Sequence, residues 1–143
     1  MNVPIVNNSQ HPLPQYQTSG AAAFDIYAVL GEPIVLQPLE RAMVPTGLHI
    51  ALPAGYVADI RPRSGLAAHH GISLVNSPAT IDSDFRGEWK VILINLSTEP
   101  YTIQDGDRIA QVVILKCETA EWQAVASLDE TDRHSGGFGH TGR

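Results

Sequence analysis

The sequence predicts an all-β fold: a jelly-roll-like antiparallel β-sandwich or barrel with one short helix and a flexible C-terminal arm. Short apolar segments recur at intervals of roughly ten residues, as the strands of such folds do. Pro and Gly residues separate these segments, which is typical of turns between strands. No stretch keeps an apolar period of about 3.6 residues for three turns, which argues against a helical bundle.

The expected strands follow one another along the first 116 residues. Tyr56–Arg61 changes polarity in steps of two, as a half-buried strand should. Lys90–Leu96 and Ile109–Leu115 are rich in β-branched residues and nearly continuously apolar, which predicts strands covered on both faces. The predicted strands are Val3–Val6, Phe24–Tyr27, Ile34–Leu36, Arg41–Val44, His49–Leu52, Tyr56–Arg61, Ile72–Val75, Lys90–Leu96, Tyr101–Ile103 and Arg108–Lys116.

The one helix predicted is Ser64–His70, with Ser64 as its N-cap. No internal repeat or second domain is visible, so residues 1–127 are expected to form one β-sandwich domain. Residues 128–143 are rich in glycine and poor in large apolar side chains, and we expect a flexible arm of the same domain. An aromatic residue and an Arg on such an arm suit a lid over a nucleotide, and a plain disordered tail is the alternative.

Composition excludes several classes of protein. The formal net charge of −6 argues against sequence-independent nucleic-acid binding, which needs a basic surface. No apolar run approaches the length of a membrane span, and the N-terminal residues lack the basic segment and apolar run of a secretory signal. A lone Cys117 cannot form an internal disulfide, so we expect a reducing, cytoplasmic location.

Arginine dominates the basic residues: it accounts for seven of the nine, and its donor fork suits phosphate oxygens, although plain surface charge explains the same bias. In Pro62–Leu66 a strand end turns into the predicted helix. Its free N–H groups, hydroxyl and guanidinium suit phosphate, with an ordinary capped turn as the alternative. Gln111, within Gly106–Gln111, lies in a strongly apolar strand, where a buried amide either bridges strands or faces a ligand.

The polar stretch Asn76–Glu88 joins two apolar segments and carries Asp82 and Asp84. An ionised carboxylate can orient and deprotonate a water molecule. The two carboxylates could instead hold a hard cation such as Mg²⁺, or simply accept hydrogen bonds from turn backbone groups. Residues and spacing alone therefore predict a β protein that binds polyphosphate, and they leave these three interpretations open.

Taken together and in this order, five segments resemble the motifs of the trimeric dUTP pyrophosphatase (dUTPase) family. The resemblance extends over nearly the whole chain, and five motifs in order are far more specific than any one of them. The five segments are Ala22–Ala28, Pro62–Leu66, Asn76–Glu88, Gly106–Gln111 and Arg133–Gly142.

The resemblance implies a homotrimer with three active sites at subunit interfaces, each closed by a neighbour's C-terminal arm. It implies hydrolysis of dUTP to dUMP and pyrophosphate, which limits uracil incorporation into DNA and supplies dUMP for thymidylate synthesis. Asp82 would activate the water that attacks the α-phosphorus. Mg²⁺ would be held chiefly by the triphosphate, with Asp25 near the site and in contact with the ion through water at most.

The resemblance also implies the residues that bind the substrate. They divide into groups for phosphate, base and sugar. The implied set is Arg63, Ser64 and Gly65 at phosphate oxygens, Gln111 at the α-phosphate, Asn76, Thr80, Ile81 and Asp82 around uracil, Phe85 on the deoxyribose, Lys90 on a neighbouring strand near the base, Arg133 at the γ-phosphate, Phe138 stacked on uracil, and Gly139, His140 and Thr141 around the phosphates.

Two positions depart from the family pattern, and two rival functions remain. Phe85 stands where the family usually has Tyr. Ala79 stands where the family usually has Gly, and this change would cost about 1 kcal/mol if the backbone at position 79 needed a positive φ.

The rival functions are that of dCTP deaminase, which belongs to the same superfamily, and that of a non-catalytic nucleotide-binding trimer. The intact Asp82 segment and the glycine-rich tail favour the pyrophosphatase, because binding alone does not require a water-activating carboxylate.

Overall fold

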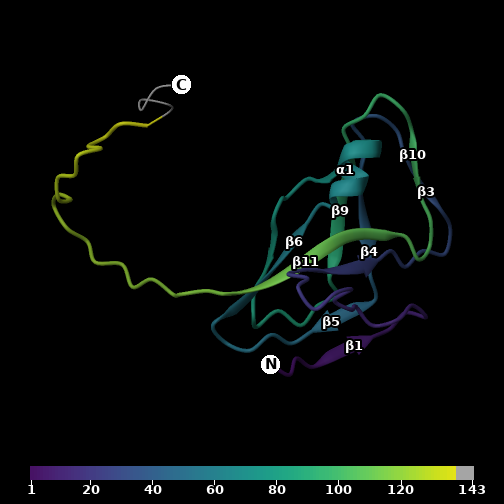
Figure 1. Cartoon of the computed structure of the whole chain (residues 1–143), viewed down its shortest axis with the longest axis horizontal. Coiled ribbons are helices and arrows are strands. Elements are labelled where there is room, and N and C mark those ends of the chain that lie inside the picture. Colours follow the sequence, from purple (N-terminus) through teal and green to yellow (C-terminus); the bar gives the residue numbers. More distant parts are fainter. Residues whose placement is uncertain (138–143) are drawn as a thin grey trace.

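A computed structural model gives the structure of the chain, and it describes residues 1–137 (Figure 1). Every strand pairing is antiparallel, and one short helix interrupts the strands in the described chain. The predicted jelly-roll-like all-β fold is confirmed. The elements are β1 (Ile5–Asn7), β2 (Phe24–Tyr27), β3 (Ile34–Leu36), β4 (Arg41–Pro45), β5 (Leu48–Ile50), β6 (Tyr56–Arg61), α1 (Ser64–His70), β7 (Ile72–Leu74), β8 (Ala79–Ile81), β9 (Lys90–Asn95), β10 (Tyr101–Ile103) and β11 (Arg108–Lys116).

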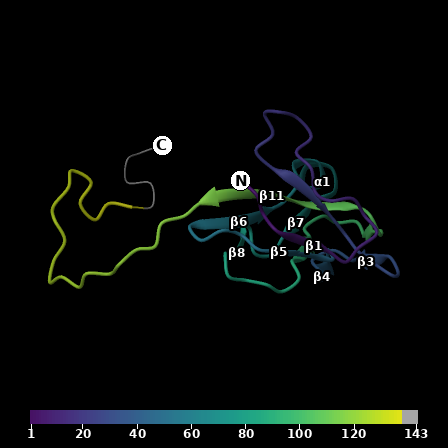
Figure 2. The same ribbon diagram turned by 90° about the horizontal axis from the view of Figure 1, so that it is seen from below.

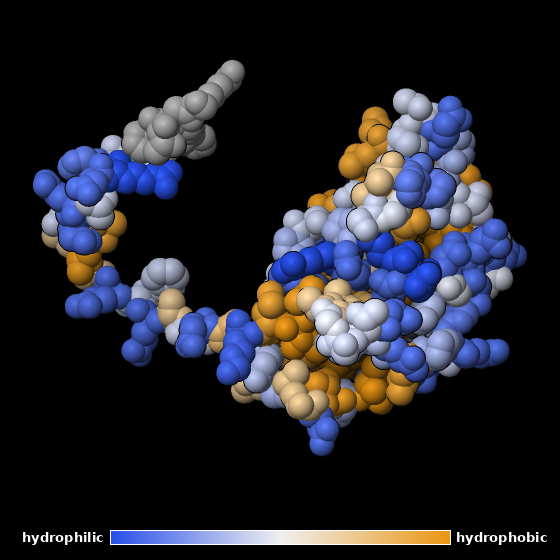
Figure 3. Space-filling model, in the orientation of Figure 1, coloured by the Kyte–Doolittle hydropathy of each residue, from blue (hydrophilic) through white to orange (hydrophobic). Residues whose placement is uncertain are grey.

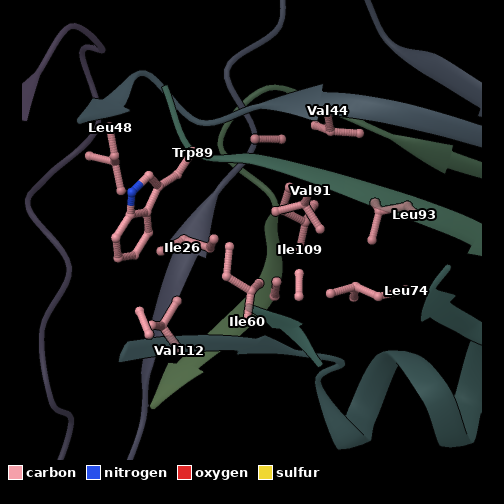
Figure 4. Packing of buried hydrophobic residues seen from close by; sticks show 14 of the residues in the cluster. Ile26, Val44, Leu48, Ile60, Leu74, Trp89, Val91, Leu93, Ile109 and Val112 are labelled. Carbon is pink, nitrogen blue, oxygen red and sulfur yellow. The ribbon is translucent and has the colours of Figure 1, made fainter. Parts of the chain in front are cut away.

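The strands form four small sheets around one core. A four-stranded sheet has the order β2-β11-β6-β8, a three-stranded sheet the order β4-β9-β7, and β1-β5 and β10-β3 are two-stranded. Apolar side chains from these sheets meet in the middle, where Trp89 lies close to Leu48, Ile26 and Val112 (Figure 4). The Trp89 side chain is fully buried. It is the largest fully buried side chain among the described residues, and aromatic side chains of this size remove much apolar area from water.

Strand β6 confirms the alternation predicted from its sequence, because Ala58 and Ile60 are buried while their neighbours are partly or fully exposed. The prediction that two strands are covered on both faces was wrong for this chain alone. On β9 only alternate residues are buried, and Ile92 and Ile94 are half-exposed. The last two residues of β11 are exposed as well. One chain does not supply enough apolar surface to cover the second face of these strands.

Strand β8 was not predicted. It has only three residues, it follows Pro78, and polar residues surround it, so its pairing with β6 is not visible in a local pattern. Ala79 lies in this strand and is buried, and it is not among the residues with positive φ. The backbone here is extended, so Ala in place of the usual Gly causes no left-handed strain.

Helix α1 has the predicted bounds, but its capping differs from the prediction. The N-cap is Arg63, with φ −84° and ψ 131°, and no side chain caps the helix. Ser64 is the first helical residue rather than the cap. The helix ends at Gly71, whose φ of 64° lies in the left-handed region that glycine adopts readily.

Residues 117–137 follow β11 and leave the body at its end remote from α1, in both ribbon views (Figures 1 and 2). Figure 3 shows this segment as a separate, mostly hydrophilic run outside the body. Its large apolar side chains are uncovered: Trp122 is 93% exposed and Leu128 84%. Among the described residues, no helix is long and apolar enough to cross a membrane.

Candidate functional site

The first candidate group surrounds Asp25 on β2, and we call Asp25, Arg63 and Arg108 the Asp25 cluster. The Oδ2 atom of Asp25 forms ion pairs with Arg63 Nε at 3.1 Å and with Arg108 Nη1 at 3.3 Å. Arg63 Nη1 also donates to the backbone carbonyl of Arg108 at 2.9 Å. The Asp25 side chain is only 17% exposed, so water screens these pairs less than it screens ordinary surface pairs.

Sheet pairing explains how residues far apart in sequence form this cluster. Gln111 on β11 pairs with Asp25 on β2 and with Arg61 on β6. Laterally paired residues project on the same face of a sheet, so Gln111 shares the face of Asp25. Its Nε2 atom donates to the carbonyl of Pro62 at 2.8 Å, just before Arg63. Gln111 therefore links β11 to the segment between β6 and α1. The sequence-based alternatives were a bridge between strands and contact with a ligand.

A cavity of about 300 Å³ adjoins the Asp25 cluster. Arg63 and Arg108 line it together with Tyr27, Leu66, Tyr101, Gly106 and Asp107. Burial of Tyr101 and, to a smaller extent, the Asp107 carboxylate raise the pKa of the phenol, while Arg63 opposes the rise. The phenol therefore stays protonated at neutral pH. Guanidinium groups, phenol hydroxyls and backbone N–H groups are donors that suit an anion.

The second candidate group surrounds Asp82, and we call its hollow the Asp82 cavity. Its volume is about 730 Å³. Because β8 pairs with β6, Thr80 lies opposite Asp59, and both line this cavity with Asp82. The remaining lining residues are Gly55, Tyr56, Val57, Ser83, Asp84, Cys117 and Thr119.

A tight turn follows Asp82. The N–H group of Phe85 donates to the carbonyl of Asp82 at 3.2 Å, and Arg86 Nη1 donates to the carbonyls of Ser83 and Phe85 at 2.7 and 2.9 Å. The ring of Phe85 folds back onto Gly87, where an added Cβ would lie 2.5 Å from its Cζ atom. Glycine at position 87 therefore lets the ring adopt this position, and the ring remains 42% exposed.

The two groups are separate within one chain, and their cavities share no lining residue. Strands β11 and β6 intervene: Ile81 pairs with Ala58, which pairs with Ile114, three residues from Gln111. Three residues along a strand and two strand spacings correspond to about 14 Å between the backbones of Ile81 and Gln111. Asp82 lies one residue farther out.

Several predicted residues join neither cavity lining in the described chain. Ser64 and Gly65 are exposed at the start of α1, beside Arg63. Asn76 is exposed after β7, and Lys90 lies on β9, in the other large sheet, 3.6 Å from Glu88.

The predicted residues of the tail are far from both groups or beyond the described chain. Arg133 is exposed, and its Nε atom donates to the carbonyl of Gly136 at 2.9 Å. The other predicted positions of the arm lie outside the described residues; they are Phe138, Gly139, His140 and Thr141.

Sequence reasoning gave no role to three residues that the structure places at these groups. Arg108 lies in the segment Gly106–Gln111, which resembles a family motif. Its position directly after Gly106-Asp107 could have marked it as a candidate for phosphate binding. Tyr101 gave no local signal, because it approaches Arg63 only through packing between strands. Asp59 lies opposite Thr80 because of β8, the strand that was not predicted.

The arrangement of the chain's carboxylates indicates how the Mg²⁺ implied by the family resemblance could be held. Among residues 1–137, no three His, Cys, Asp or Glu side chains form a group that could hold a metal ion. Asp25 is engaged by two guanidinium groups through one oxygen. Mg²⁺ is commonly held by one or two carboxylates, several waters and substrate phosphates. This donor set fits an ion that arrives with the triphosphate rather than one held by a protein cage.

Comparison with known proteins places the chain among its relatives. A family model described as dUTPase matches residues 9–142. A deoxyuridine 5'-triphosphate nucleotidohydrolase of Finegoldia magna is 54% identical over 142 residues, covering 99% of this chain and 99% of that protein. The enzyme of the same name from Cytophaga hutchinsonii is 56% identical over 142 residues, covering 99% of this chain and 92% of that protein.

Solved structures share the fold at low sequence identity. A mutant dUTPase of Staphylococcus bacteriophage 80alpha, solved with dUpNHpp, has a TM-score of 0.90 at 23% identity and covers 99% of both chains. A mutant dUTPase from phage phi11 of S. aureus, whose structure concerns the coordination of a structural Mg(II) ion, has a TM-score of 0.81 at 22% identity, covering 91% of this chain and 100% of that one. From the family match and the full-length relatives, we conclude that the chain belongs to the dUTPase family.

Proposed function

We propose that the chain hydrolyses dUTP to dUMP and pyrophosphate. Membership of the dUTPase family carries this proposal, since the two relatives named for this activity are 54% and 56% identical to this chain over 142 residues. The two candidate groups supply what the reaction requires. The Asp25 cluster offers donors for a polyanion, and the Asp82 cavity offers an exposed carboxylate beside a hollow.

The active site in this proposal combines the Asp25 cluster of one chain with the Asp82 cavity of another, within a homotrimer. Two observations support it. The two groups are separated by two strands within a chain. In addition, β9 has a half-covered apolar face, and Trp122 and Leu128 are uncovered on the tail. Exposed apolar surface of this kind favours burial against further copies of the chain.

In the proposed reaction, Asp82 orients a water molecule and takes its proton as the oxygen attacks the α-phosphorus. The bond from the α-phosphorus to its bridging oxygen breaks, and pyrophosphate leaves with the electron pair. Arg63, the start of α1 at Ser64 and Gly65, and Gln111 hold phosphate oxygens and oppose the growing negative charge. Mg²⁺ bound to the triphosphate would supply further positive charge.

Base and sugar selection in this proposal come from the segment around β8. Asn76 and the backbone of Thr80, Ile81 and Asp82 pair with uracil. Cytosine presents an acceptor and an amino group where uracil presents N3–H and a carbonyl, so fixed backbone partners would be left unpaired. The ring of Phe85 covers the deoxyribose, and Lys90, despite its place in the other large sheet, is proposed to lie near the base of a bound substrate.

The tail, residues 128–143, closes over a neighbouring chain's site in the proposal. Arg133 would reach the γ-phosphate and Phe138 would stack on uracil, while Gly139, His140 and Thr141 would wrap the phosphates. The support is that the rest of the chain leaves the large apolar residues in the described part of this tail exposed. A lone Cys117 with an exposed thiol also supports a reducing location such as the cytoplasm.

The proposal is tested by incubating the purified protein with dUTP, UTP, dCTP and dTTP in the presence of Mg²⁺, and by resolving the products chromatographically. Rapid conversion of dUTP alone to dUMP and pyrophosphate is expected. Deamination of dCTP would show the sister activity instead, and no turnover of any nucleotide would indicate a non-catalytic binding protein. The variant Asp82→Asn is expected to bind dUTP and to lose turnover by about a hundredfold or more.

A further inference from the structure

The ring of His11 packs against the turn between β10 and β11 from outside both candidate groups. Its Nε2 atom lies 3.0 Å from Asp105 Oδ1, although the two residues are 94 positions apart. Its centroid is 5.9 Å from that of Tyr27. An added Cβ on Gly106, whose φ is +82°, would lie 3.1 Å from His11 Cε1. The ring therefore touches two residues that line the cavity beside the Asp25 cluster, namely Tyr27 and Gly106.

The segment that carries His11 is fixed by its own hydrogen bonds. The side chain of Asn7 donates to the carbonyl of His11 at 2.8 Å. The hydroxyl of Ser9 donates to Asn7 Oδ1 at 2.7 Å and accepts from the N–H of His11 at 3.1 Å. The N–H of Asn8 donates to the carbonyl of Gly47 at 2.8 Å, next to β5. The ring thus projects from an anchored loop, and the His11 side chain is only 20% exposed.

A short path of contacts leads from His11 to Arg63. Asp105 Oδ1 also accepts from the N–H of Leu30 at 2.9 Å, so the carboxylate joins three segments. The turn continues directly into Arg108, whose carbonyl accepts from Arg63 Nη1 at 2.9 Å. A displacement of the turn at Asp105 would move this carbonyl, and with it the guanidinium group of Arg63.

We propose that His11 is a positioning residue, which holds the β10–β11 turn so that Arg63 and Arg108 meet the phosphates beyond the α-phosphate. The inference rests on the proposed function, because it assigns the Asp25 cluster to phosphate binding. His11 touches none of the reacting atoms and acts through Asp105. The hydrogen bond to Asp105 is the essential contact, and packing against Tyr27 and Gly106 is secondary.

Two substitutions separate these contacts. His11→Gln keeps a side-chain N–H donor near the place of Nε2 and removes the ring. His11→Phe keeps a ring over Gly106 and Tyr27 and removes the donor to Asp105. Because His69 is exposed on α1 and its ring neighbour is His70, His69→Ala serves as the matched control.

The test measures the dissociation constants of dUpNHpp with Mg²⁺ and of dUMP for the full-length protein, together with its thermal midpoint and its mass by light scattering. His11→Ala and His11→Phe are expected to weaken dUpNHpp binding about tenfold while dUMP binding stays within about twofold, since only the triphosphate needs the outer contacts. His11→Gln is expected to recover most of the loss, and His69→Ala to resemble the wild type.

Equal weakening of both ligands would show that His11 is merely structural, and unchanged binding of both would remove it from phosphate positioning. Full retention of dUpNHpp binding in His11→Phe would also overturn the proposal. If His11→Ala does not fold, the His11→Gln and His11→Phe pair decides the question. Failure of the wild type itself to bind or hydrolyse dUTP would refute the proposed function and would be recognised before any variant is compared.

Discussion

Replacing Asp25 by Asn tests whether this carboxylate orients the arginines or binds a metal ion. Asn has nearly the same shape, but it is neutral and places an amide N–H₂ where a carboxylate oxygen was. Asn can place its carbonyl oxygen at the position of Oδ2, but that oxygen carries no full negative charge, so both guanidinium groups lose the charge that offsets their mutual repulsion. Arg63 Nε and Arg108 Nη1 both lie within 3.3 Å of one oxygen, so these two nitrogens are no more than about 6.4 Å apart.

The size of the effect follows from exposure and distance. The side chains of Asp25, Arg63 and Arg108 are 17%, 26% and 47% exposed, so the pairs are partly screened. At an effective dielectric constant of about 20 to 40, two positive charges about 6 Å apart repel by about 1–3 kcal/mol once the carboxylate is gone. Outward movement of Arg108 relieves part of this repulsion, and we expect a loss of about 1–2 kcal/mol in the free energy of unfolding. Added salt reduces the repulsion and therefore the loss.

The assay combines urea unfolding at fixed protein concentration with steady-state release of pyrophosphate from dUTP. Misplacement of Arg63 is expected to lower kcat/KM about a hundredfold, and the loss should persist at saturating Mg²⁺. Glu40→Gln, which removes a carboxylate that accepts from the N–H of Gln37 in an exposed turn, is the control and should change neither quantity appreciably. Recovery of Asp25→Asn activity by excess Mg²⁺ would refute the orienting role and indicate a metal ligand instead.

Three further predictions concern the Phe85 ring, the Asp105 carboxylate and the tail. Gly87→Ala should displace the exposed Phe85 ring and raise the KM for dUTP several-fold with little loss of stability, whereas Gly20→Ala, with nothing within 4 Å, should change neither. The N–H of Leu30 and then His11 lower the pKa of Asp105 below its ordinary value of 3.8, so its stabilisation is present above that pH and is lost as pH falls through the lower, folded-state pKa. Thermal midpoints should therefore show Asp105→Asn less stable than the wild type at neutral pH, with the difference shrinking below about pH 3.8; a constant difference down to pH 2 would contradict this. Deleting residues 133–143 should abolish dUTP turnover and leave the mass in light scattering that of the trimer, while a fully active truncated chain would contradict the lid role.

Local patterns predicted most of the strands, because each leaves a signal in a few neighbouring residues. The alternation in Tyr56–Arg61 reflects one buried and one exposed face, and it was confirmed. The short strand Ala79–Ile81 left no such signal, since its formation depends on pairing with β6. Ser64 was wrongly assigned as the N-cap. The extended backbone angles of an N-cap occur one residue earlier, at Arg63, and residue type alone did not reveal where they occur.

The candidate site was predictable as a set of segments and not as an arrangement. The family resemblance singled out Arg63, Gln111 and Asp82, but no local pattern could show that the first two gather around Asp25 while Asp82 lies two strands away. That separation is a property of the strand order β2-β11-β6-β8. The link between His11 and Asp105 is likewise a long-range contact, and composition gives no indication of it.

Subunit complementation measures most directly whether one active site is built from different chains. Two differently tagged variants, Asp82→Asn and Arg63→Ala, would be coexpressed and the mixed oligomer isolated by tandem purification. Each variant alone should be inactive. Every mixed trimer holds two copies of one variant and one of the other, so one of its three sites receives an intact Asp82 and an intact Arg63 from neighbouring chains, and about a third of wild-type dUTP turnover should return. Mixed oligomers no more active than the separate variants would contradict the shared site and place both groups in a single chain's active site.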